Sequence, residues 1–152
     1  MEENWKLEHV GIVVRDTEKA VEYYQSLGIT RFRPASIGSP ETWTDFMVYG
    51  KPATPETKVK IRWFQIGEVA AEFLQPVEGE TPWRDSLDKN GEGIQHICFL
   101  VDDLERETAK MVEKGASVIH SAGIGSAMRW AYFDTLKIGG AIIELKTVQK
   151  QV

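Results

Sequence analysis

The feature that most constrains the fold is an internal repeat. Residues 7–29 align without a gap with residues 94–116, at a constant offset of 87, and the offset pairs His9 with His96. The other paired residues include Val14 with Val101, Asp16 with Asp103, Glu18 with Glu105, and Gly28 with Gly115. Two copies of one supersecondary unit are therefore expected to pack around a shared core.

Each copy predicts a strand followed by a helix. A β-branched and aromatic run comes first, which is typical of a strand. Asp16 or Asp103 then stands where a helix N-cap is expected, and apolar residues at helical spacing follow. Gly28 and Gly115 occupy the position at which helices commonly end in a left-handed residue.

A second match completes each copy. The segment Gly67–Phe73 resembles Gly139–Leu145, and both read as strands that hold a glutamate, Glu72 or Glu144, among apolar neighbours. Each half therefore reads β-α-β-β-β. We expect the α+β class and a single domain over residues 1–152, built of two modules at about 5–76 and 92–148.

Composition excludes several functional classes. The chain has 152 residues, 42% hydrophobic and 27% charged, which fits one globular domain. Its apolar runs are far shorter than the roughly twenty residues of a membrane span. A net charge of −5 without a basic run disfavours nucleic acid and anionic membranes. Cys98 is the sole cysteine and the acidic N-terminus shows no secretory signal, so we expect a cytoplasmic protein.

Two segments lie outside the repeat. Residues 35–57 are rich in Pro, Gly, Ser and Thr and read as a loop, with a possible short strand at Thr44–Val48. Between the halves, Thr81 followed by Pro82 predicts the start of a short helix that runs to about Lys89.

The repeated histidines and glutamates suggest a metal site. Strand alternation places His9 on a face with Leu7, and His96 on a face with Ile94. A buried carboxylate needs a partner, and one borderline divalent cation would satisfy two imidazoles and two carboxylates together. The proposed ligands are His9, Glu72, His96 and Glu144. Packing alone is the competing interpretation, because inward histidines are commonly core residues and strand glutamates commonly pair with Arg or Lys.

The chain resembles the vicinal oxygen chelate superfamily, which includes glyoxalase I, extradiol dioxygenases and methylmalonyl-CoA epimerases, and it is most similar to the epimerases. The resemblance covers nearly the whole chain. The matching stretches are Leu7–Val14, Glu72–Pro76, Gly91–Leu104 and Gly139–Leu145.

The resemblance implies paired βαβββ modules in a U-shaped open barrel, commonly as a homodimer, around one divalent ion (Co, Mn, Ni, Zn or Fe). By motif position the ligands are the same four residues. The chain departs from the family in two places. It has Gln95-His96 where two histidines are usual, and the stretch Val59–Gln65 lacks the carboxylate expected of the general base.

The expected activity is a metal-dependent isomerase resembling methylmalonyl-CoA epimerase, in which the ion stabilises an enolate while Glu144 and Glu72 transfer the α-proton. The expected partner is a small molecule, for which an acyl-CoA is one candidate, and Trp43, Trp63 and Trp130 are candidates to line its pocket. Candidate cations for CoA phosphates are Arg31, Arg33, Lys60, Arg62, Arg129 and Lys137. The alternatives are a glyoxalase-type isomerase or lyase acting on a small hydroxy or keto acid, a dioxygenase, and a metal-free binding protein.

Overall fold

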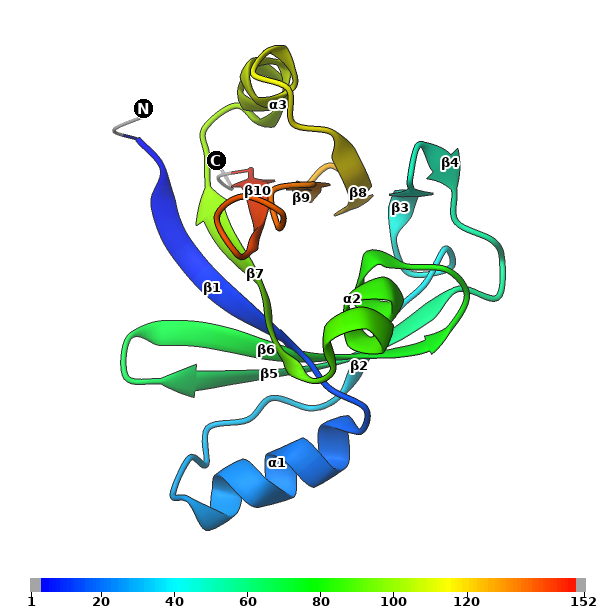
Figure 1. Cartoon of the computed structure of the whole chain (residues 1–152). Helices are drawn as coiled ribbons and strands as arrows, with labels where there is room; N and C mark the ends of the chain where they lie inside the picture. Colours follow the sequence, from blue (N-terminus) through cyan, green and yellow to red (C-terminus); the bar gives the residue numbers. More distant parts are fainter. Residues whose placement is uncertain (1–3, 150–152) are drawn as a thin grey trace.

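The computed structural model describes residues 4–149, and ten strands among them form one curled sheet (Figure 1). The strands are β1 (Lys6–Val13), β2 (Ser36–Gly38), β3 (Thr44–Val48), β4 (Lys51–Pro52), β5 (Lys58–Ile66), β6 (Val69–Glu78), β7 (Gly93–Leu100), β8 (Val118–Ile124), β9 (Met128–Phe133) and β10 (Ile142–Val148). The helices are α1 (Thr17–Ser26), α2 (Pro82–Asn90) and α3 (Leu104–Glu113). Residues 1–3, part of the N-terminus considered for a secretory signal, lie outside the described range.

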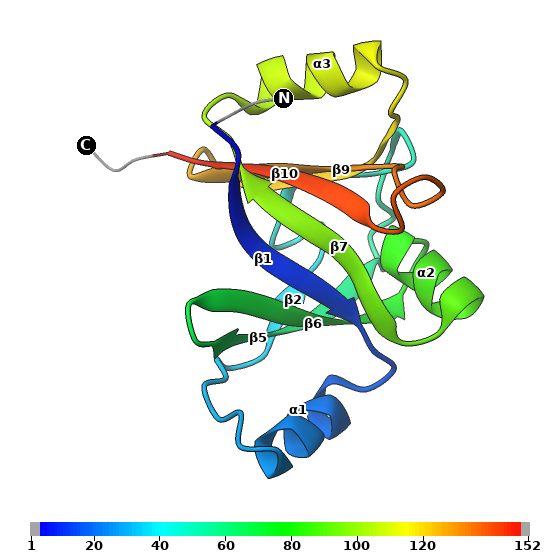
Figure 2. The same ribbon diagram turned by 60° about the vertical axis from the view of Figure 1, so that its left-hand side comes forward.

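Eight strands of the sheet form two corresponding halves, β2-β5-β6-β1 and β7-β10-β9-β8, and β3 and β4 extend the second half. The order of the whole sheet is β2-β5-β6-β1-β7-β10-β9-β8-β3-β4. Strand β1 is parallel to β6, β7 is parallel to β10, and β1 meets β7 antiparallel at the centre. Figure 2 shows these two strands side by side, with α1 and α3 at opposite ends of the molecule. The predicted α+β class, with paired βαβββ modules around an open barrel, is confirmed.

The helix signals of the sequence are also confirmed. The Asp16 side chain accepts hydrogen bonds from two backbone amides at the start of α1, and Asp103 caps α3. Gly28 and Gly115 follow these helices with φ of 94° and 95°, a conformation that glycine adopts without a Cβ penalty. The Thr81 side chain caps α2, which begins with Pro82 and ends at Asn90. No helix within residues 4–149 is long and apolar enough to cross a membrane.

The segment between residues 35 and 57 is more ordered than a loop. The predicted strand at Thr44–Val48 is present as β3, but β2 and β4 were not predicted as strands. Strand β2 pairs with β5 at one edge of the sheet, whereas β3 pairs with β8 near the other edge, which β4 forms. Residues 39–43 therefore join opposite ends of the sheet. Pairing with β2 and β3 satisfies backbone groups that β5 and β8 would otherwise leave open.

His120, on β8 of the second module, contacts β3 through a hydrogen bond. Its ring is fully buried, with Nδ1 2.9 Å from the Met47 carbonyl oxygen of β3, while Nε2 accepts a hydrogen bond from the Trp130 indole at 3.0 Å. A neutral ring with the proton on Nδ1 satisfies both contacts. Burial lowers the pKa of His120 to about 4. The aromatic rings of Trp43, Phe46, Trp83 and Tyr132 surround it.

We expect His120 to make the protein sensitive to acid. Its pKa is lower in the folded chain than the ordinary value of about 6.5, so the unfolded chain binds more protons and stability falls as pH drops from 6.5 toward 4. Denaturation of metal-free wild type and His120→Gln at pH 7 and pH 4.5 measures this. The stability advantage of wild type should shrink by about 2.5 kcal/mol. An advantage unchanged with pH would contradict a neutral buried ring, because all other titrating groups are common to both proteins.

Candidate metal centre

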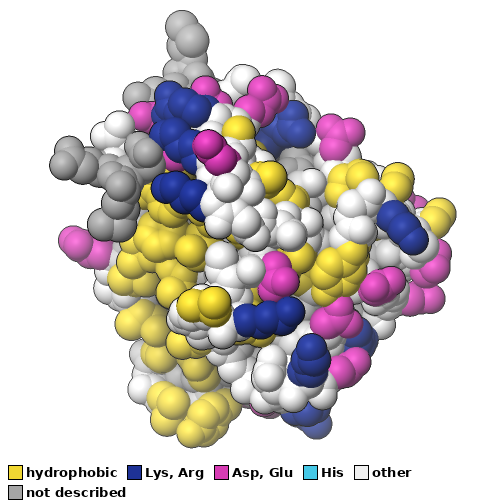
Figure 3. Space-filling model, turned by 45° about the horizontal axis from the view of Figure 1, so that its top comes forward, with side chains coloured by type: hydrophobic (Ala, Val, Ile, Leu, Met, Phe, Trp, Pro, Cys, Tyr) yellow, Lys and Arg dark blue, Asp and Glu magenta, His cyan; other side chains and the backbone are white. Residues whose placement is uncertain are grey.

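The four predicted ligands converge on the concave face of the sheet. Each comes from one of four consecutive strands of the sheet: Glu72 from β6, His9 from β1, His96 from β7 and Glu144 from β10. All four side chains are buried. Figure 3 agrees, since no histidine surface appears on the face it shows. Both modules therefore donate one imidazole and one carboxylate to the same point.

The ligand atoms are spaced as an ion requires. The Nε2 atoms of His9 and His96 are 3.2 Å apart. Each lies 3.2–3.3 Å from Glu72 Oε1 and 3.2 Å from Glu144 Oε2. Two atoms bound about 2.0–2.2 Å from one ion at tetrahedral or octahedral angles are roughly 2.8–3.6 Å apart. These four atoms thus fit a single divalent cation.

The chemistry of the cluster also fits a cation. Glu144 Oε2 is buried and makes no well-aligned hydrogen bond within residues 4–149, although the Nε2 atoms of His9 and His96 each lie 3.2 Å from it. Burial alone would raise the pKa of Glu72 and Glu144, but His9 and His96 hold both pKa values below the usual range. Without an ion, the carboxylates thus require protons on the imidazoles. One divalent ion would replace those two protons and supply the same total charge.

Two β-bulges orient the histidines. In the ladder between β1 and β7 the register shifts between Leu7 and His9, and again opposite Gln95. Each bulge turns the residue before a histidine toward that histidine. Glu8 contacts His9 Nδ1, and Gln95 Oε1 lies 2.8 Å from His96 Nδ1. These contacts fix the ring tautomers so that both Nε2 atoms face the proposed ion.

The Glu8 carboxylate should strengthen metal binding through His9. Glu8→Gln keeps the shape but removes the charge, and loss of such an outer partner typically weakens metal affinity 10- to 100-fold. Competition with a chelator, followed by elemental analysis, measures the change. Glu22→Gln on α1, far from the site, is the matched control and should bind as wild type does. Equal affinities in all three proteins would contradict the orienting role.

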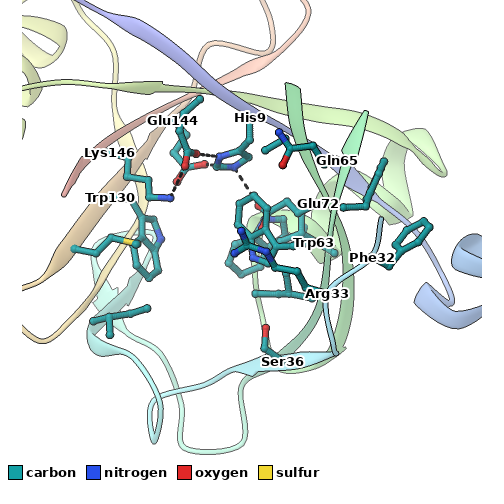
Figure 4. Close-up of a pocket in the computed structure, with 18 of the residues that line it drawn as sticks. His9, Phe32, Arg33, Ser36, Trp63, Gln65, Glu72, Trp130, Glu144 and Lys146 are labelled. Atoms are coloured by element: carbon teal, nitrogen blue, oxygen red, sulfur yellow. Dashed lines mark hydrogen bonds and ion pairs between the residues drawn. The ribbon is translucent and has the colours of Figure 1, made fainter. Parts of the chain in front are cut away.

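A cavity of about 580 Å³ opens onto the cluster, a volume typical of small-molecule sites. Aromatic side chains form much of its wall, and Figure 4 shows His9, Trp63, Trp130 and Lys146 around it. The Tyr132 hydroxyl lies 3.3 Å from His96 Nε2. Burial raises the pKa of Tyr132 well above its ordinary value, so its hydroxyl keeps its proton and donates hydrogen bonds. The cavity therefore combines apolar walls with a few polar groups at one end.

The family model described as the Glyoxalase/Bleomycin resistance protein/Dioxygenase superfamily matches residues 8–133. The chain belongs to this superfamily. An uncharacterized protein of Bacillus subtilis is 24% identical over 143 residues, covering 92% of this chain and 90% of the relative. An ethylmalonyl-CoA/methylmalonyl-CoA epimerase of Cereibacter sphaeroides is 29% identical over 148 residues, covering 94% and 98%.

A solved structure supports the superfamily fold. A variant of the Streptomyces coelicolor methylmalonyl-CoA epimerase, in complex with 2-nitronate-propionyl-CoA, superposes with a TM-score of 0.66 at 20% identity, covering 95% of this chain and 98% of the other. The predicted resemblance to the superfamily, and within it to the epimerases, is confirmed.

Only some of the cations and tryptophans proposed from the sequence line the cavity. Arg31 and Arg33 line it, as do all three candidate tryptophans. Lys60 and Arg62 instead pair with Glu18. Arg129 and Lys137 are exposed and do not line the cavity.

The face assignment was wrong for two residues. Leu7 and Ile94 are 56% and 64% exposed, although alternation placed them with the histidines. Each lies on the far side of a bulge from its histidine, and a bulge resets which face later residues occupy.

Two charged residues of the cavity lining, Glu8 and Lys146, were missed. Glu8 was not found because simple alternation turns it away from His9. Lys146 carried a usable signal, since it follows Glu144 by two residues on an inward-facing strand.

Proposed function

We propose that the protein is a metal-dependent isomerase that removes and returns an acidic α-proton, with methylmalonyl-CoA as the first candidate substrate. The observation that carries the proposal is the spacing of four ligand atoms at the end of a substrate-sized cavity. Similarity to curated epimerases supports the choice of reaction.

The ion would be held by His9, Glu72, His96 and Glu144, and would supply a Lewis acid that stabilises negative charge on a substrate oxygen. Epimerisation also needs proton transfer on two faces of the substrate carbon. The imidazole contacts use Oε1 of Glu72 and Oε2 of Glu144. The second oxygen of each carboxylate remains for the proton, so we assign Glu144 as one acid/base group and Glu72 as the other.

The rest of the cavity would orient an acyl-CoA. Arg31 and Arg33 are exposed residues of its lining, where guanidinium groups suit phosphate. The aromatic wall excludes water from the acyl group, which strengthens every charge interaction within. The epimerase of Streptomyces coelicolor with its bound CoA analogue supports this class of substrate.

Isotope exchange tests the proposal. Methylmalonyl-CoA is incubated with metal-loaded protein in heavy water, and deuterium at C2 is followed by mass spectrometry. We expect incorporation far above the uncatalysed rate, and none above it with chelator-treated protein. The absence of exchange by protein shown to carry metal would contradict the epimerase assignment.

One observation favours a second candidate, a glyoxalase-type isomerase or lyase acting on a small hydroxy or keto acid. Strand β5 presents Trp63 and Gln65 to the cavity where the epimerase resemblance calls for a carboxylate. Among the described residues, the cavity carboxylates are Glu8 and the two ligands. Exchange at C3 of 2-oxobutyrate, without exchange in methylmalonyl-CoA, would support this candidate.

A further inference from the structure

Lys146 is a buried cation to which the proposed metal centre assigns no role. It is 6% exposed and lines the cavity, although lysine is rarely buried without a specific partner. It lies on the same face of β10 as Glu144, two residues away, which corresponds to roughly 7 Å along the strand. Figure 4 shows its ammonium group directed toward the end of the cavity where the ligands meet.

Two contacts hold this side chain in place, and the pairing of its strand restrains the backbone. Its Nζ donates to Glu8 Oε1 at 3.0 Å and lies 5.6 Å from the centroid of the Trp63 ring. Its strand is internal, flanked by β7 and β9, so the backbone has little freedom. Glu8 uses only one ammonium hydrogen, and an ammonium group has three. The cation is therefore fixed, charged and equipped to bind a second acceptor.

The net charge of the site indicates that the second acceptor of the Lys146 ammonium group would be an anion. With neutral imidazoles, Glu8, Glu72 and Glu144 contribute three negative charges, while Lys146 and a divalent ion contribute three positive ones. The loaded site is thus neutral with Lys146, and would repel an anion without it. At the equivalent position of the first module stands Leu74, so this lysine has no counterpart at the corresponding position of the other module.

We propose that Lys146 binds a carboxylate of the substrate, and that it thereby selects carboxylated acyl compounds over uncharged ones. The inference rests on the metal centre of the proposed function and adds a determinant of substrate class to it. Arg31 and Arg33 are too exposed to serve this purpose beside the ligands, and would contact more distant anionic groups.

Ligand binding to the cobalt-loaded protein tests this without turnover. Malonate is the anionic probe and imidazole is the neutral probe, and the visible absorption of Co²⁺ reports both. In Lys146→Met we expect malonate affinity to fall at least about tenfold, as for other hydrogen bonds to charged groups, while imidazole affinity changes less than about twofold. Lys146→Arg should recover most of the malonate affinity. Lys60→Met, which removes a lysine paired with Glu18 outside the cavity, is the matched control.

The metal content of each variant, measured by elemental analysis, shows whether a lower malonate affinity results from loss of the Lys146 contact or from loss of the metal. Unchanged malonate affinity in Lys146→Met would overturn the proposal. An equal loss of both probes would also overturn it, as would wild type that does not bind malonate. If the binding results are as expected but isotope exchange fails, the epimerase assignment is wrong and the carboxylate site at Lys146 is still supported.

Discussion

Glu144→Ala should lower turnover at least about a thousandfold while the protein remains folded. The change removes a proposed ligand and a proposed acid/base group together, each of which is typically worth a factor of 100 or more. The fold should persist because the substitution takes a buried carboxylate, one oxygen of which makes no well-aligned hydrogen bond within residues 4–149, out of a low-dielectric site. Activity, metal content and circular dichroism are measured on the same preparation.

Glu78→Ala is the matched control for this substitution. Glu78 is an exposed glutamate at the end of β6, so its replacement should leave activity and metal content unchanged. Full activity of Glu144→Ala would remove Glu144 from the acid/base assignment, and full metal content would remove it from the ligand set.

Gly11→Ala should destabilise the protein by about 3 kcal/mol and displace His96, a proposed metal ligand. A Cβ at this position would lie 1.9 Å from Cε1 and 2.2 Å from Nε2 of His96, far inside contact distance. The His96 ring is fully buried, so it has no space to move into. Overpacking of this kind costs 1–3 kcal/mol or more. Chemical denaturation and metal analysis of the variant measure both effects.

Gly28→Ala separates this clash from the general cost of replacing glycine. No atom would lie within 4 Å of its Cβ, and the strain comes only from a φ of 94°. We expect a loss of about 1 kcal/mol and normal metal content. A Gly11→Ala protein that is as stable as Gly28→Ala and retains its metal would contradict the close approach of His96.

The internal repeat explains why so much could be predicted from the sequence. Once His9 is matched with His96 and Glu72 with Glu144, the pairing of equivalent strands brings all four to one point. Helix boundaries were equally accessible, because Asp103 and Gly115 act through local backbone geometry that neighbouring residues determine.

The missed features depend on pairing between distant strands. A bulge is a property of two strands in register, so neither Glu8 nor Gln95 reveals in the sequence that it turns toward a histidine. The crossing of residues 39–43 was hidden for a similar reason, since β3 pairs with β8 more than seventy residues away. Periodicity within one segment carries no information about such partners.

The two copies differ at the atoms that surround the ligands. The partner of His9 is the anionic Glu8, whereas the partner of His96 is the uncharged Gln95. Lys146 stands on one side and Leu74 on the other. If the two modules had identical residues around the proposed ligands, a molecule that binds through two oxygen atoms could bind equally well in either of two opposite orientations. Because the copies differ at these positions, the two orientations are no longer equivalent. We expect the residues that differ between the copies to determine which orientation a substrate adopts.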